Sequence, residues 1–256
     1  MDAQEQQESV ADEPGSEAGA AEGAAVTGDV AGDAFSDDPI YRAAVIDLLG
    51  ALAYGSLTAF SRLAADAEMA PNPPAKAALA RVAVAEFLHY EALAGRLTEM
   101  GADPDVAMDP FIAPIDEFHD RTKPTGWLEG LVKAYVGDGI ATDFYREISA
   151  YVDPWTQKLV RAVLQDVGQA EFAVKAVRGA IETDPKVAGR LALWGRRLVG
   201  EALSQSQRVA AERDALASLL VGGIDRPGAD LAEMGRMFAR LTDEHIHRMG
   251  QLGLSA

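Results

Sequence analysis

The sequence predicts an all-α chain, in which a four-helix bundle is followed by two additional C-terminal helices. Proline and glycine fall between long segments rich in Ala, Leu, Arg and Glu, as expected for helices separated by breakers. The alternation of apolar and polar residues that marks half-buried strands is nearly absent. Both observations favour helices packed on helices rather than a sheet.

The N-terminal 38 residues differ from the rest of the chain. They hold eleven of the 40 acidic residues, none of the 23 basic ones and almost no large apolar side chains. Such a segment buries too little surface to offset its ordering entropy, so we expect residues 1–38 to form a disordered acidic tail. The remaining 29 acids and 23 bases leave residues 39–256 mildly acidic, and this length suits one helical domain.

The helix boundaries follow from proline, glycine and capping residues. Asp37 or Asp38 can cap the first helix, and Pro71-Asn72-Pro73-Pro74 ends it. Asp153-Pro154 and Asp184-Pro185 are cap-and-proline signals further along the chain. We expect long helices at 39–69, 74–100, 126–151 and 154–183, additional helices at 185–221 and 230–252, and a crossover connection at 102–125 with a short helix near 115–119.

The composition excludes several classes of function. With no cysteine, the chain has no disulfide, thiolate nucleophile or iron–sulfur cluster, so oxygen and nitrogen ligands must hold any metal. No basic region precedes an apolar run at the N-terminus, and no uninterrupted apolar stretch has the length of a membrane span. We therefore expect a cytoplasmic protein with no membrane partner.

Polar residues interrupt the predicted inward stripe of each of the first four helices. The second helix places Glu86 and His89 one turn apart between Val82 and Leu93. The other interruptions are Ser56 on the first helix, Asp138 on the third, and Asp166 with Gln169 on the fourth. Since a bundle core favours apolar side chains, these positions are candidates for a site in the bundle interior.

This arrangement resembles the ferritin-like di-iron proteins, in which two helices give one Glu each and two others give Glu-x-x-His. Glu86 and His89 match one such pair, and Asp138 matches a single carboxylate position. Ser56 stands where the pattern has a Glu, while Asp166 and Gln169 replace the second Glu-x-x-His pair. The likeness covers about residues 39–252 and implies a ferritin-like fold.

Three further segments are similar to those of ferritin-like proteins from high-GC Gram-positive bacteria, which are distantly similar to a tRNA hydroxylase that oxidises a hypermodified adenosine. These segments are Leu48-Leu49-Gly50-Ala51-Leu52-Ala53-Tyr54-Gly55, Tyr135-Val136-Gly137-Asp138-Gly139 and Leu193-Trp194-Gly195-Arg196-Arg197. The resemblance implies a non-haem oxidoreductase or hydroxylase that holds one or two ions of iron, or manganese, through Glu86, His89, Asp138 and Asp166. A small molecule or a modified nucleoside would be its substrate.

A metal-free reading stays open beside this one. Arg196 or Arg197 of the fifth helix can reach inward and neutralise the buried acids, since Glu201, Gln205 and Arg208 share one face there. The bundle would then be a degenerate relative that acts as a binding or structural protein. Iron storage is disfavoured, because the extra helices and the acidic tail do not suit a closed shell.

Net acidity also disfavours nucleic acid as a partner, because such binding usually needs a basic face. A homo-oligomer is compatible with the sequence. His119, in the predicted crossover, is expected at the surface.

Overall fold

The computed structural model describes residues 38–165, 169–221 and 230–256. Nine α-helices and two short 3-10 helices make up most of these residues. The predicted tail lies almost entirely outside these residues. The helices are α1 (Pro39–Asp66), α2 (Pro73–Glu99), α3 (Pro104–Arg121), α4 (Trp127–Ile148), α5 (Pro154–Val163), α6 (Gln169–Thr183), α7 (Lys186–Glu212), α8 (Asp214–Val221) and α9 (Leu231–Gln251). The prediction of an all-α fold is confirmed.

Most of these helices begin with a capping residue whose side-chain oxygen accepts hydrogen bonds from backbone N–H groups, as the sequence indicates. Asp38 accepts hydrogen bonds from the backbone N–H groups of Ile40 and Tyr41 at 2.8 and 3.2 Å. Asn72, Asp103, Asp153 and Asp230 cap α2, α3, α5 and α9 in the same way. Each cap satisfies amide groups that have no partner inside the helix, which explains why the helices begin at these positions.

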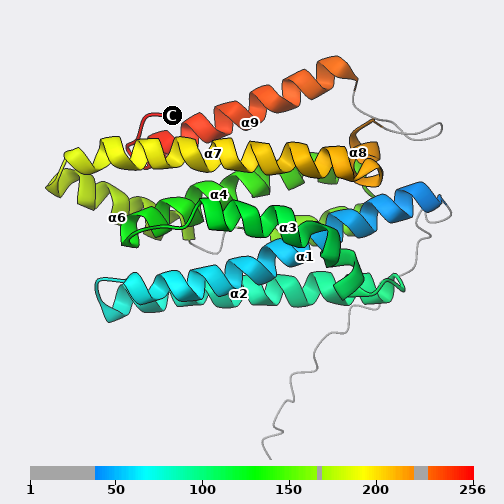
Figure 1. Cartoon of the computed structure of the whole chain (residues 1–256), viewed down its shortest axis with the longest axis horizontal. Coiled ribbons are helices and arrows are strands. Elements are labelled where there is room, and N and C mark those ends of the chain that lie inside the picture. Colours follow the sequence, from blue (N-terminus) through cyan, green and yellow to red (C-terminus); the bar gives the residue numbers. More distant parts are fainter. Residues whose placement is uncertain (1–37, 166–168, 222–229) are drawn as a thin grey trace, which may run out of the picture. The chain divides into compact units, whose positions relative to one another are not determined.

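Two apolar clusters form the core. In the first, the N-terminal half of α1 packs against the C-terminal half of α2, the start of α3, and helices α5 and α8. In the second, the C-terminal half of α1 and the start of α2 pack near α4, α6, α7 and α9. Figure 1 shows α1, α2, α4 and α7 lying roughly along a common direction. The first four predicted helices correspond to α1, α2, α4 and the pair α5 and α6.

The prediction of a crossover with only a short helix at 115–119 is wrong, because α3 is a helix of 18 residues. Pro110 and Pro114 lie inside it, and each removes one intrahelical hydrogen bond. Ala107 and Phe111 are buried against α1 and α2, and this packing offsets the lost bonds. Two other predicted helices are divided: α5 ends at Val163, before residues outside the description, and Arg213 separates α7 from α8.

An ion pair between a half-buried arginine and a buried aspartate fixes the corner between α7 and α8 onto α1. Arg213 donates from Nε to Oδ2 of Asp47 at 3.0 Å and from Nη2 to Oδ1, while Asp47 is only 4% exposed. Such a two-bond pair orients the guanidinium more strictly than a single contact does. It therefore defines where the chain turns back across the bundle.

Among the described helices, only the segment Pro39–Met69 has the length and apolar composition of a membrane span, and 61% of its most apolar window is buried inside the bundle. A core helix of a helical bundle has the same properties. The cytoplasmic location expected from the sequence stays a prediction.

Candidate functional site

A partly open cavity of about 770 Å³ lies between the helices of the bundle. Its walls come from α1, α2, α3, α4, α5, α6 and α9, whereas α7 contributes no lining residue. Apolar side chains such as Leu52, Leu63, Phe118 and Val174 form much of the surface. Among the described residues, this cavity is where side chains from most of the helices converge.

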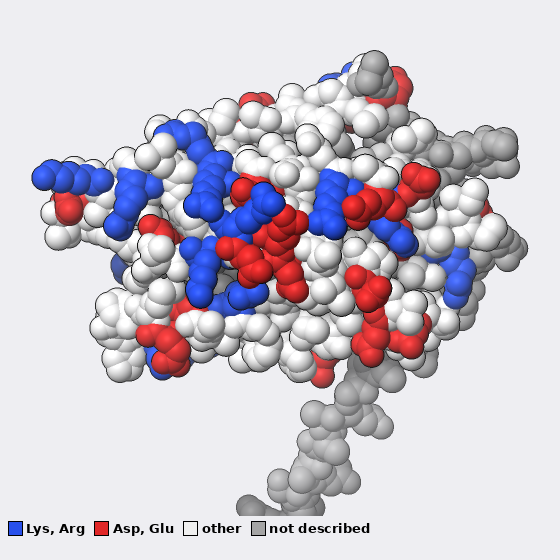
Figure 2. Space-filling view, viewed as in Figure 1, with Lys and Arg blue, Asp and Glu red and all other residues white. Residues whose placement is uncertain are grey.

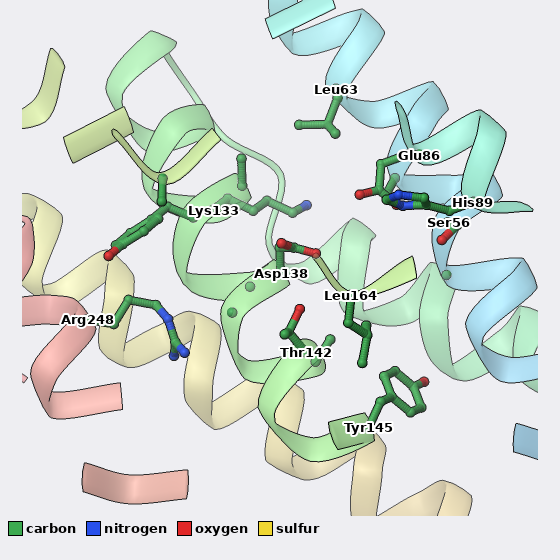
Figure 3. A pocket seen from close by; sticks show the side chains of 18 of the residues that line it. Ser56, Leu63, Glu86, His89, Lys133, Asp138, Thr142, Tyr145, Leu164 and Arg248 are labelled. Carbon is green, nitrogen blue, oxygen red and sulfur yellow. The ribbon is translucent and has the colours of Figure 1, made fainter. Parts of the chain in front are cut away.

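Glu86 and His89 face the cavity together from α2. Oε2 of Glu86 lies 3.6 Å from Nδ1 of His89, and both side chains are largely buried. Their spacing of three residues places them on one face of the helix. Ser56, 8% exposed on the neighbouring α1, lines the same wall. Figure 3 shows these three side chains on one side of the cavity.

Asp138 lines the cavity from α4, across from the α2 pair, as Figure 3 shows. It is an exposed residue, unlike Glu86. Asp166 lies outside the described residues, and so does the side chain of Gln169. Within the described ranges, no three His, Cys, Asp or Glu side chains are grouped closely enough to hold a metal ion.

A second polar cluster lies along the cavity wall where α1, α3 and α4 meet. It consists of Arg62 and Asp66 on α1, His119 on α3 and Lys133 on α4. The prediction that His119 lies at the surface is wrong, because its Nδ1 is buried and has no hydrogen-bond partner. Burial, followed by the charges on Lys133 and Arg62, lowers the pKa of His119 to about 3. The imidazole is therefore neutral at pH 7.

Lys133 is a buried cation, with 8% of its surface exposed. Burial lowers the pKa of its amine to about 8, and the nearby charges of Asp66, Arg62 and Asp120 modify this effect. Burial also raises the pKa of Asp66 above its usual range. The sequence contained a signal for this lysine, since it lies between Val132 and Ala134 in an apolar run. Sequence reasoning missed it, because a lysine in an apolar run more often extends its amine to solvent along its aliphatic stem.

A third polar group lies where α9 crosses α4. Arg248 donates to Oδ2 of Asp143 at 2.5 Å, and Arg146 donates to Oδ1 at 3.3 Å. Gly139 permits this crossing, because a Cβ at that position would overlap the Arg248 side chain. Nη1 of Arg248 is buried without a partner, and Arg248 lines the cavity. The cations of the site thus come from α1, α4 and α9.

The arginines of the fifth predicted helix do not supply these charges. Arg196 donates to the carbonyl groups of Ser255 and Ala256, and Arg197 donates to the carbonyl of Arg121. Arg208 pairs with Glu117 at 2.9 Å and with Glu212 at 3.0 Å. Figure 2 shows acidic and basic side chains next to one another on this face of the molecule. Arg196 and Arg197 therefore do not form the inward network that the metal-free reading allowed.

Comparison with known families identifies the fold more closely. Residues 39–223 match the model of a ferritin-like domain of actinomycetes. The chain belongs to this ferritin-like family. No curated protein matches the sequence. The resemblance to the tRNA hydroxylase stays a prediction.

The matched residues end before α9, which begins at Leu231. Glu244, His247, Arg248 and Gln251 of α9 nevertheless line the cavity. In this ferritin-like protein, a helix outside the matched domain therefore closes one side of the site.

The donor set tests whether the metal centre of ferritin-like proteins fits this cavity. The dinuclear plan uses four carboxylates and two imidazoles from four helices. The described residues bring one carboxylate and one imidazole together, Glu86 and His89, with Ser56 rather than a carboxylate beside them. This pair suits one side of a single metal ion, whereas the complete dinuclear set does not fit the described residues.

Proposed function

We propose that this ferritin-like bundle binds a small, largely apolar organic molecule in the cavity between its helices. The observation that carries the proposal is the cavity itself, since about 770 Å³ falls within the range of ligand pockets. Apolar walls with a few convergent polar groups are also typical of such pockets. Glu86 with His89 and Lys133 with Asp66 would orient the ligand from two different walls.

Filling the cavity tests this proposal. Ala59 lines the cavity on α1, so Ala59→Phe places an aromatic ring in the ligand volume. Ala64 is exposed on the same helix, and Ala64→Phe is the matched control. The probe is the neutral apolar dye N-phenylnaphthylamine, whose emission rises in an apolar site. Circular dichroism confirms that both variants fold.

We expect saturable binding of the dye to the wild type and to Ala64→Phe, and loss of binding in Ala59→Phe. The absence of saturable binding to the wild type contradicts the proposal. Equal binding to all three proteins does so too, because the dye would then occupy a different surface.

The second candidate function is that of a metal-dependent oxidoreductase or hydroxylase, and the adjacent Glu86 and His89 favour it. These two residues would hold iron or manganese with Asp138 and Asp166, as one or two ions. Bound iron supplies the activation of dioxygen in such sites. The protein residues would exclude water and position a small molecule or a modified nucleoside in the cavity.

Metal content distinguishes the two candidates. The full-length protein is purified without a metal-binding tag and assayed for iron and manganese, before and after anaerobic iron loading. His89→Ala removes the imidazole, while Glu91→Ala changes an exposed carboxylate of the same helix. Stoichiometric metal that is lost only from His89→Ala supports the oxidoreductase. Equal metal content in all three proteins, or no metal in any of them, contradicts the oxidoreductase, and ligand binding is then the one candidate that remains.

A further inference from the structure

The environment of Lys133 differs from that of an ordinary buried lysine. Its amine lies 5.6 Å from the ring centre of Phe118, and within the described residues it makes no hydrogen bond or ion pair. Figure 3 shows the side chain pointing from α4 into the cavity. Buried lysines usually pair with a carboxylate, so an unpaired amine at a cavity wall indicates a group available for a ligand.

Two further groups lie at the same part of the wall. The carboxylate of Asp66 packs close to Gly130, one helical turn before Lys133, and it lines the cavity. Burial raises the pKa of Asp66, so this carboxyl takes up a proton more readily than a surface aspartate. The neutral His119 lines the cavity from α3. An amine, a carboxyl and an imidazole therefore converge on one apolar space.

We propose that Lys133 is a nucleophile that condenses with an apolar aldehyde or ketone in the cavity to form an imine. The inference rests on the proposed ligand-binding function and specifies the chemistry of that site. A buried lysine in a hydrophobic pocket is the usual arrangement for this reaction.

The reaction balances with the groups at hand. The neutral amine attacks the carbonyl carbon, the new N–C bond forms, and the carbonyl oxygen takes up a proton to give a carbinolamine. The nitrogen has by then lost one proton, its electron pair forms the C=N bond, and the hydroxyl group leaves as water after protonation. Loss of the second N–H proton from the resulting iminium gives the imine. Asp66, which lines the same cavity, would donate and accept these protons. No oxidant or reductant is needed.

The surrounding charges favour a neutral carbonyl compound over a charged ligand. Arg62 and Asp66 on α1, Asp120 on α3, Glu86 on α2 and Asp138 on α4 flank the amine or line the same cavity. Because both positive and negative side chains line the cavity, its electrostatic potential favours neither an anionic nor a cationic ligand. An apolar aldehyde enters without burying a charge. With its pKa at about 8, Lys133 keeps roughly a tenth of its amine neutral at pH 7, far more than a surface lysine does.

Reductive trapping tests the inference on the full-length protein. The protein is incubated at pH 7 with octanal and sodium cyanoborohydride, which reduces an imine to a stable alkylamine. Intact mass and peptide mapping then locate the octyl group over time. Lys133→Arg is the test variant, and Lys158→Arg, at an exposed position of α5, is the matched control. Octanol, which cannot form an imine, is tested separately for displacement of N-phenylnaphthylamine.

We expect Lys133 to be alkylated at least about tenfold faster than Lys158, because its neutral fraction is larger. The fast phase should disappear in Lys133→Arg and persist in Lys158→Arg. Alkylation spread evenly over the surface lysines overturns the inference. If octanol displaces the dye while Lys133 shows no preference, the ligand-binding function stands and the imine does not. If octanol fails as well, both proposals are wrong.

Discussion

At the scale of single residues, burial rather than pairing has the largest effect on the charge of His119, Lys133 and Asp66 at the cavity wall. His119 and Lys133 both have a lowered pKa, and the largest cause in each case is loss of water. For Asp66 the same cause acts in the opposite direction, because its charged form is the anion. Each group is thereby moved toward its neutral state, which suits an apolar cavity.

His119 should make the protein sensitive to acid. In the unfolded chain its pKa lies near 6.5 and in the folded protein near 3. Between these values only the unfolded chain binds the proton, so the free energy of unfolding falls as the pH drops. The slope from this residue approaches about 1.4 kcal/mol per pH unit. Denaturant titrations of wild type and His119→Leu between pH 7 and 4 measure it.

The wild type should lose stability relative to His119→Leu over this range, whatever their difference at pH 7. His247→Leu, at an exposed position of α9, is the control for replacing a histidine by leucine. Parallel curves for wild type and His119→Leu contradict the argument.

The pair of Arg213 with Asp47 should matter more than surface pairs. Arg213→Met leaves a carboxylate that is 4% exposed without its partner. We expect a loss of about 1–3 kcal/mol in the free energy of unfolding. Arg236→Met removes an exposed pair with Glu233, which water screens, and should cost clearly less than Arg213→Met. Equal effects in urea titrations of the two variants disagree with this account.

At the scale of elements, helix contacts depend on small residues at particular crossings. A Cβ at Gly50 of α1 would lie closer than 3.0 Å to the backbone carbonyl group of Ala107 on α3. Backbone atoms cannot rotate away, so the two helices would have to separate. Gly55 lies on the same helix with open space around its would-be Cβ.

Gly50→Ala should therefore destabilise the fold by about 1–3 kcal/mol, as other overpacked cores do. Gly55→Ala should stabilise α1 by about 0.5–1 kcal/mol, because alanine has the higher helix propensity. Chemical denaturation of both variants checks the opposite signs. A stabilised Gly50→Ala would show that α1 and α3 are not in close contact.

Helix propensity was a better guide to where helices begin than to how far they extend. The caps Asp38 and Asp153 were predicted from their positions before proline and are observed. At the start of α4, Gly126 takes the cap position, and Thr125 donates to Glu129. Helix α3 was underestimated because its prolines are breakers in isolation. Packing of Phe111 against the core, which the sequence does not display, compensates for them.

At the scale of the whole molecule, the cavity depends on α9, which is far from α1 in sequence. Met249 and Leu252 at the end of α9 are fully buried, and Met249 packs against Gly195 of α7. Arg178 of α6 donates to the carbonyl of Gln251 at 2.9 Å. The C-terminal residues therefore belong to the core rather than to an appended segment.

Met249→Ala should cost about 2–5 kcal/mol of unfolding free energy, since it empties a fully enclosed position. Ile246→Ala changes a side chain of α9 that is 52% exposed and should cost no more than about 0.5 kcal/mol. Thermal and urea unfolding of the two variants compare these effects. A small effect of Met249→Ala contradicts a core role for the end of α9.

The sequence by itself determined the fold class, the polar interruptions and the family resemblance. Glu86 and His89 could be identified because helical spacing places them on one apolar stripe, and the structure places them side by side. Only the tertiary structure decided that His119, Lys133 and Asp66 meet, since they come from three helices separated by long stretches of chain. The spacing of apolar residues along a helix indicates which of its faces points inward. Which charged groups are shielded from water depends on how several helices pack around them, and this packing is a property of the tertiary structure.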